Sequence, residues 1–188
     1  MYAAKTFEFQ NFDALPGMDM SIINRHLGLY YKYVDRTNEW LSRSPADKMQ
    51  LAADASRSPF DFNGMRLHEI YFEQLYPGGI SNPFEQPYLM EAIDSDVEGW
   101  MQSMVDLTKI PGPGWATFGK DMDEGRFLMT RINSHEIGPL ISLGNIFVID
   151  GWEHAYLPGT MDEYLEGFFK NINWPLINER IASVAGIP

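Results

Sequence analysis

Apolar residues recur along the first part of the chain with the spacing of amphipathic helices. In residues 18–43 the apolar positions Ile23, Leu27, Tyr30 and Val34 are three or four residues apart, which predicts one long helix. Residues 44–47 (SPAD) are typical of a turn with an N-cap, so we expect a short second helix over 46–56. A third helix is expected after Pro59, and the PGG at 77–79 should end it.

The pattern changes in the second half of the chain. Residues 88–109 again have helical spacing, but three short runs rich in β-branched and aromatic residues follow the PGPG at 111–114: WATFGKD, GRFLMTRIN and ISLGNIFVID. Separated by Asp/Gly turns, these runs predict strands, and residues 161–172 and 175–186 return to helix. The order predicts an α+β fold, an N-terminal antiparallel helical hairpin followed by a C-terminal domain with a small three-stranded antiparallel sheet.

The loop at Asn82 and Pro83 is the expected boundary between two domains, residues 1–83 and 84–188. The 188 residues include 14% aromatic residues, enough to build a buried core and to argue against disorder. A net charge of −12 disfavours nucleic acid as a partner, because duplex binding needs a basic surface. The absence of cysteine excludes disulfides, thiolate metal sites and thiol nucleophiles.

The sequence has no run of 18 apolar residues, so no membrane span and no membrane partner are expected. Its first 17 residues have one lysine and lack the apolar block of a secretory signal. We therefore expect a cytoplasmic protein.

Four histidines offer candidate chemistry, although scattered histidines are most often surface residues or satisfied core residues. His26 and His68 lie on the apolar faces of two helices that should pack antiparallel. Each buried imidazole needs a partner, because an unpaired buried polar group costs about 1–3 kcal/mol. Two such histidines facing each other across a hairpin can form half of a metal site.

Asp150 and His154 could supply the other half. Asp150 ends an apolar strand, where an unbonded carboxylate is unfavourable, and His154 follows four residues later. Spacing alone leaves two interpretations open, a helix N-cap aspartate beside a core histidine, or an Asp and a His that converge on one ion. A set of three imidazoles and one carboxylate would suit iron or manganese.

At these residues the chain resembles the iron/manganese superoxide dismutases. DGWEHAY at 150–156 is similar to the family signature D-x-W-E-H-A-Y, and NGMRLHEIYF at 63–72 is similar to its N-x-x-x-x-H-x-x-F-[FW] helix. HLGLYY at 26–31 resembles H-Y-G-K-H-H, and GPGWA at 112–116 resembles G-S-G-W-[AG]. Asn173, Trp174 and Arg180 match a C-terminal N-W-x-x-x-x-x-R. The matches span nearly the whole chain in the family's order.

The resemblance implies a mononuclear centre between the two domains, with one iron or manganese ion per subunit. Its four ligands would be His26, His68, Asp150 and His154, with a water or hydroxide as the fifth. Superoxide would be the substrate, disproportionated to O₂ and H₂O₂ as the metal alternates between two oxidation states. The bound solvent would supply a proton, with an acidity set by hydrogen bonds around it.

The resemblance also assigns roles around the ion. A Gln or His that donates to the solvent comes either from the position of Gly64 or from the loop before the last strand, which points to His135. The alternative for His135 is an exposed turn residue. Arg180 would stand at the substrate funnel, where a local cation offsets the repulsion of superoxide by a negative protein. Trp115 and Trp152 would wall the pocket, although a Trp is more often plain core.

Glu153 is implied to reach His154 of a second subunit in a homodimer, which could pair into a tetramer. The alternative for Glu153 is an ordinary first-turn glutamate favoured by the helix dipole. The sequence does not decide between iron and manganese.

The chain departs from the family where substrate access is controlled. The His and Tyr expected four and eight residues after the first ligand are Tyr30 and Val34, and the second Tyr expected after the signature is Leu157. Tyr33 lies one residue early, which turns a helical side chain by about 100°, so Tyr30 is the expected remaining gate residue. Besides a dismutase, the sequence leaves open a relative with another redox or oxygen activity and a structural protein with a vestigial site.

Overall fold

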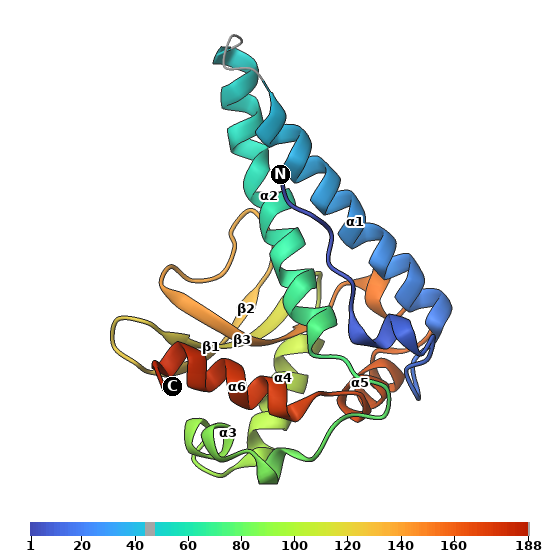
Figure 1. Cartoon of the computed structure of the whole chain (residues 1–188), viewed down its shortest axis with the longest axis vertical. Helices are drawn as coiled ribbons and strands as arrows, with labels where there is room; N and C mark the ends of the chain where they lie inside the picture. The colour runs from blue at the N-terminus through green and yellow to red at the C-terminus, as the bar shows by residue number, and fades with distance from the viewer. Residues whose placement is uncertain (44–47, 188) are drawn as a thin grey trace.

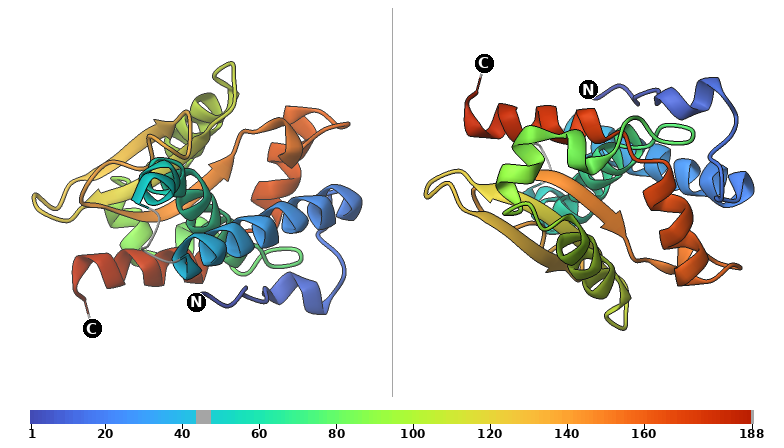
Figure 2. Two further views of the ribbon diagram at one scale, coloured as in Figure 1. Left: turned by 90° about the horizontal axis from the view of Figure 1, so that it is seen from above. Right: turned by 90° about the horizontal axis from the view of Figure 1, so that it is seen from below.

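A computed structural model describes residues 1–43 and 48–187. The two longest helices, α1 (Met20–Ser42) and α2 (Lys48–Glu73), form a hairpin that projects beyond the rest of the molecule (Figure 1). The N-terminal segment, with the 3-10 helix η1 (Glu8–Asn11), lies beside this hairpin (Figure 2). No helix in the described part of the chain is both long enough and apolar enough to cross a membrane.

Helix α1 forms where the apolar spacing predicts it. The Asp19 side chain caps its first turn by accepting a hydrogen bond from the Ser21 backbone N–H at 2.7 Å. Its buried face includes Ile23, His26 and Leu27, which are covered by α2 and the N-terminal segment. The one imidazole on this otherwise apolar face therefore points into the hairpin.

The prediction of two separate helices over 46–56 and after Pro59 is wrong, because α2 is continuous with Pro59 inside it. A proline removes the N–H that would bond the carbonyl four residues earlier, here that of Ala55. The Ser58 hydroxyl donates to this carbonyl at 3.2 Å and supplies the missing bond. The expected turn at 44–47 lies outside the described residues.

The single helix predicted over 88–109 is also wrong, since α3 (Pro87–Ala92) and α4 (Val97–Lys109) are separate. Asp94 and Ser95 between them have positive φ angles of 52° and 63°, which a helix cannot contain. The Asp96 side chain then accepts the Gly99 N–H at 2.9 Å and starts α4. Asp94 and Ser95 therefore connect the two helices, and Asp96 caps the second one.

The three predicted strands form one antiparallel sheet of order β2-β1-β3, which confirms the α+β prediction. The strands are β1 (Trp115–Asp121), β2 (Phe127–Ile132) and β3 (Leu143–Asp150). The register pairs Trp115 of β1 with Asp150 of β3. Because directly paired residues point to the same face of a sheet, the indole and the carboxylate are neighbours.

The outer edge of β3 is covered by a side chain of α6 and by that of the residue that follows α2. Gln74, just after α2, donates its amide to the Val148 carbonyl at 2.5 Å, and its oxygen lies 3.4 Å from the Val148 N–H. Arg180 of α6 (Trp174–Ala185) donates to the Ile146 carbonyl at 3.0 Å. Edge strands are normally protected from pairing with other chains, and here Gln74 and Arg180 protect β3 by bonding the carbonyls of Val148 and Ile146.

The last elements complete the core. The 3-10 helix η3 (Glu153–Ala155) follows β3 directly, and α5 (Met161–Lys170) lies between η3 and α6. A second short 3-10 helix, η2 (Pro83–Glu85), leads into α3. Phe147 of β3 contacts both Trp100 of α4 and Trp174 at the start of α6, so the sheet shares one aromatic core with these helices.

Candidate metal centre

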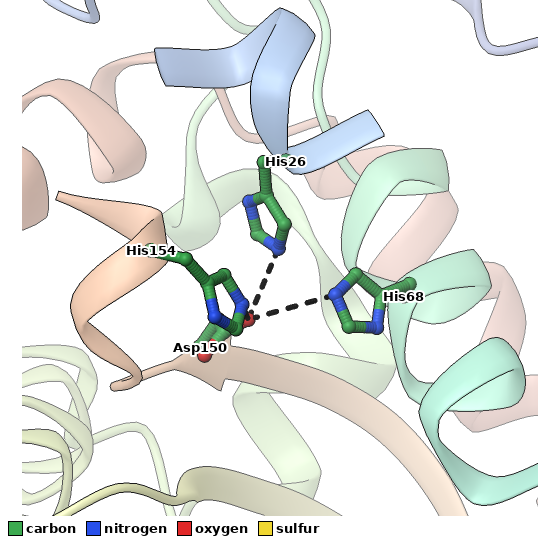
Figure 3. A group of neighbouring side chains, drawn as sticks. All are labelled: His26, His68, Asp150 and His154. Carbon is green, nitrogen blue, oxygen red and sulfur yellow. Dashed lines mark hydrogen bonds and ion pairs between the residues drawn. The ribbon is translucent and has the colours of Figure 1, made fainter. Parts of the chain in front are cut away.

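Four side chains from four elements converge between the hairpin and the sheet (Figure 3). The Nε2 atoms of His26 and His154 each lie 3.0 Å from Asp150 Oδ2, and His68 Nε2 lies 3.9 Å from the same oxygen. One donor atom from each residue falls within 4.8 Å of all the others. The structure therefore brings together the four residues that the sequence singled out.

Each of these side chains is held by local structure. His26 comes from α1, His68 from α2, Asp150 from the end of β3, and His154 from η3. The His68 Nδ1 bonds the Gly64 carbonyl at 2.6 Å, one helical turn earlier. A carbonyl can only accept, so Nδ1 carries the proton and the Nε2 lone pair faces the cluster. Asp150 Oδ1 accepts the Trp152 N–H at 2.8 Å, which leaves Oδ2 for the histidines.

Burial sets the charge states of the cluster. His26, His68 and Asp150 are fully buried, and burial lowers the pKa of His26 and, more strongly, of His68. Burial alone would raise the pKa of Asp150, but the charge and hydrogen bond of His154 and the hydrogen bond of His26 outweigh it and lower that pKa. Burial opposes protonation of His154 too, yet the Asp150 charge prevails and raises the His154 pKa. The cluster thus offers two neutral imidazoles, those of His26 and His68, beside an ionised carboxylate that favours the protonated form of His154.

The arrangement fits a metal ion better than a hydrogen-bonded cluster. The Nδ1 of His26 and the Nε2 of His68 are buried without a hydrogen bond, and the Nε2 of His26 lies 3.0 Å from Asp150 Oδ2. Ligand atoms that share one ion at about 2.1 Å lie about 3–4 Å apart, and the three histidine Nε2 atoms lie 3.0–3.9 Å from Asp150 Oδ2. Three imidazoles and one carboxylate suit iron or manganese.

His135 is buried beside this cluster, which overturns the alternative of an exposed turn residue. Its Nε2 is 2.9 Å from the Trp115 Nε1, and the Asn63 amide holds its backbone carbonyl at 2.7 Å. Burial lowers the pKa of His135 to about 4, so the ring is neutral at physiological pH. Gly64 leaves the space for it, since a Cβ there would lie 2.8 Å from His135 Nδ1.

Tyr30 points away from the cluster. Its hydroxyl accepts the Lys5 N–H at 2.8 Å and lies 3.4 Å from Glu69, while its ring packs on Phe7 and Phe72. A side chain four residues after His26 is rotated by about 40° around the helix, and here that rotation turns the phenol toward the N-terminal segment.

Tyr33 lies beside the cluster instead, although its offset from the family position argued against it. Its ring is 5.2 Å from that of His68 and 5.4 Å from that of His135. Burial, followed by the charge of Asp150, raises its pKa to about 12. Residues seven apart on a helix differ by only about 20° in direction, so the spacing from His26 was the signal.

Arg180 is held at the outer edge of β3, and its expected placement at the substrate funnel stays a prediction. Its guanidinium bonds the Ile146 carbonyl and pairs with Glu73 at 2.7 Å, and its side chain is only 15% exposed. These partners tie α6 to α2 and β3. Arg180 therefore has a structural role at the edge of β3.

The exposed side of the cluster is at His154, whose side chain is 21% exposed. Arg25 shares with Glu153 and His154 an open depression of about 580 Å³ and donates to the Leu157 carbonyl at 2.5 Å. Trp115 packs on His68 with ring centroids 5.0 Å apart, and Trp152 stacks on His154 at 5.9 Å. Both tryptophans therefore line the cluster.

Comparisons with known proteins point to one family. A family model for iron/manganese superoxide dismutases, C-terminal domain, matches residues 86–180. The iron superoxide dismutase of Aquifex aeolicus is 34% identical over 186 residues, which cover 88% of this chain and 85% of that protein. That of Sulfolobus acidocaldarius is 24% identical over 94% of both chains. Manganese superoxide dismutase 2, mitochondrial, of Arabidopsis thaliana is 29% identical over 87% of this chain and 75% of its own. With matches of this extent around a buried cluster of three histidines and one aspartate, the chain belongs to the iron/manganese superoxide dismutase family.

Proposed function

We propose that this protein is a superoxide dismutase that holds one iron or manganese ion per subunit through His26, His68, Asp150 and His154. Two superoxide anions and two protons then yield O₂ and H₂O₂, so electrons and charges balance without another reactant. The observation that carries the proposal is the convergence of four donor atoms within 4.8 Å in a buried cluster. The relatives are named dismutases, which favours this activity over another redox chemistry on the same fold.

The ion, when bound, supplies a one-electron couple that alternates between its trivalent and divalent states. The protein supplies the rest. Asp150 contributes one negative charge that lowers the net charge of the centre, and the neutral imidazoles of His26 and His68 contribute lone pairs without charge. Trp115 and Trp152 exclude bulk water from one side of the cluster.

Peroxide leaves only after protonation, so the residues that hold protons near the cluster matter for turnover. His135 is the candidate, since it is buried beside the cluster and stays neutral at pH 7. Tyr33 is the second candidate and takes the role that the sequence had given to Tyr30, because its ring contacts both His68 and His135. A phenol with a raised pKa keeps its proton through the physiological range.

The ligand assignment is tested by metal content. We expect His154→Ala to lose bound iron or manganese, measured by elemental analysis of purified protein, together with activity in a xanthine oxidase–cytochrome c assay. His135→Ala is the matched control, since it also removes a histidine near the cluster but no proposed ligand, and it should retain metal. Unchanged metal stoichiometry in His154→Ala would refute the ligand set, while full metal without dismutase activity in the wild type would refute the function.

We also propose a homodimer in which the face around Glu153 and His154 is covered by a second subunit. Support comes from the exposure of His154, a proposed ligand that an isolated chain leaves partly open to solvent. Sedimentation velocity should give a dimer or a tetramer, and Glu153→Ala should weaken it. A monomer at micromolar concentration would contradict this proposal.

Two further expectations stay predictions. The division into domains at residues 1–83 and 84–188 would be tested by limited proteolysis, with first cleavage expected near residue 83. The cytoplasmic location would be tested by fractionation of cells of the source organism followed by immunoblotting.

A further inference from the structure

Arg25 and Glu153 carry opposite charges on one open face of the molecule. Arg25 lies on α1, Glu153 lies in η3 directly before His154, and both Arg25 and Glu153 are exposed. They line the depression of about 580 Å³ at the exposed side of the cluster, together with Leu157 and Pro158. Within the described residues neither Arg25 nor Glu153 forms an ion pair, so both charges lack a partner in their own chain.

The Arg25 guanidinium is anchored but keeps most of its donors free. Its Nη2 donates to the Leu157 carbonyl at 2.5 Å, which fixes the group beside the depression. A guanidinium has five N–H donors, and this is its one hydrogen bond within the described part of the chain. Leu157 itself is 43% exposed and would gain from burial. The depression thus combines a fixed positive charge, a free carboxylate and exposed apolar surface.

A second copy of this chain supplies the charges that this face lacks. In a two-fold symmetric dimer the same surface is used by both subunits, so every contact between two different residues occurs twice. Arg25 of each subunit can then meet Glu153 of the other, because both lie in one depression. Two subunits of net charge −12 repel each other, and opposite charges placed at their contact offset this repulsion.

We propose that Arg25 of each subunit pairs with Glu153 of the other across a two-fold interface, and that these contacts close the exposed side of the cluster. His154 shares the depression with Arg25, so a carboxylate that enters it from a second subunit also lies beside this exposed proposed ligand. The inference deepens the proposed homodimer and rests on it, but it does not depend on dismutase activity. The family motifs in the sequence begin at His26, so they gave no indication of Arg25.

Charge reversal tests the pair, with the dimer Kd measured by sedimentation velocity of the full chain loaded with iron or manganese. Arg25→Glu and Glu153→Arg should each raise Kd by at least about 100-fold, because each places like charges opposite each other at two contacts. The double variant should return to within about tenfold of the wild type. Lys32→Glu is the matched control, since Lys32 is an exposed cation of the same helix outside the depression, and it should leave Kd unchanged.

A mixing experiment shows whether the pair joins two subunits. A heterodimer of one Arg25→Glu subunit and one Glu153→Arg subunit has opposite charges at both contacts, whereas each homodimer has like charges at both. Fluorescently labelled Arg25→Glu should therefore sediment as a dimer only after Glu153→Arg is added, at a concentration where each variant alone is a monomer. If the double variant dimerises and the mixture does not, the pair lies within one subunit and the proposal is overturned.

The remaining outcomes separate this inference from the proposed function. A wild-type dimer whose Kd is unchanged by Arg25→Glu would overturn the inference, and a monomeric wild type would overturn both it and the homodimer. If the pairing is found but the wild type has no dismutase activity with either metal, the proposed function fails and the inference stands. Metal content and thermal unfolding check that each variant is intact, and Arg25→Gln, which removes the charge without reversing it, should still raise Kd by about tenfold.

Discussion

Two glycines in the hairpin provide a matched test of how tightly the cluster is packed. Gly28 lies inside α1 and Gly64 inside α2, and an interior Gly→Ala change favours a helix by about 1 kcal/mol. A Cβ at Gly28 meets nothing within 4 Å, whereas one at Gly64 meets His135 Nδ1 at 2.8 Å and Tyr33 Cδ1 at 3.1 Å. The imidazole cannot move aside freely, since Phe60 and Trp152 pack on it and Trp115 is bonded to it.

The two substitutions should therefore have opposite effects on stability. Gly28→Ala should raise the free energy of unfolding by about 1 kcal/mol. In Gly64→Ala the new methyl group is forced against His135 and Tyr33, and such overpacking costs about 1–3 kcal/mol. This cost offsets the helical gain and leaves the variant up to about 2 kcal/mol less stable than the wild type. In a chain of this size 1 kcal/mol corresponds to about 2–4 °C in Tm, so the variants should differ by several degrees.

Thermal and urea unfolding of the two variants at one protein concentration and one metal content would measure this difference. Activity provides a second readout, because displacement of His135 should reduce turnover in Gly64→Ala and leave Gly28→Ala unchanged. Equal stabilisation by both substitutions would show that the imidazole does not occupy the space beside Gly64, and the reasoning about His135 would fail.

Three further predictions follow from the same geometry. The metal-free protein should lose stability as the pH falls below about 6.5, because His26 and His68 have lowered pKa values in the folded protein and are protonated more readily in the unfolded chain. His68→Gln should reduce this dependence of stability on pH, measured as the difference between the urea midpoints at pH 7.5 and 5.5. A difference no larger in the wild type than in the variant would be the contrary result. Tyr33→Phe should reduce activity with little change in Tm, whereas Tyr30→Phe should lower Tm without changing turnover. The reverse pattern would show that Tyr30, not Tyr33, is the gate residue. Arg180→Met should lower the free energy of unfolding by about 2 kcal/mol, because the bonds to Glu73 and Ile146 are lost, while the folded variant keeps its activity. A fall in kcat/KM at unchanged stability would instead place Arg180 on the path of the substrate.

Periodicity and residue chemistry predicted most of the architecture. The long first helix and the three strands required only local signals, namely helical spacing and short β-rich runs. Polar residues on apolar faces made His26, His68, Asp150 and His154 candidates, but spacing alone left two interpretations of Asp150 and His154 open, and the full ligand set followed from the resemblance to a family. These signals are strong because a buried charge or imidazole has few alternatives to a specific partner.

The errors arose where one local interaction offsets another or where the signal for a break is weak. Pro59 predicts a break, but the Ser58 hydroxyl satisfies the carbonyl that the proline leaves free, and the helix continues. Asp94 and Ser95 gave too weak a signal to interrupt an amphipathic pattern. Tyr33 was excluded by its offset from a family position, although its angle around the helix from His26 was favourable. The contacts of Arg180 with Glu73 and with the edge of β3 join segments far apart in sequence, which no local pattern encodes.

The bonds between Gln74 and Val148 have a consequence for how the protein acquires its ion. Gln74 follows His68 by six residues along one segment, and Val148 precedes Asp150 by two on the neighbouring strand. The hydrogen bonds between Gln74 and Val148 therefore fix the distance between His68 and Asp150 without the help of a metal ion. Such a centre is preorganised, so the folded protein should bind the ion from solution without first rearranging its ligands. The rate of metal uptake should then be limited by the access of the ion between the hairpin and the sheet rather than by folding.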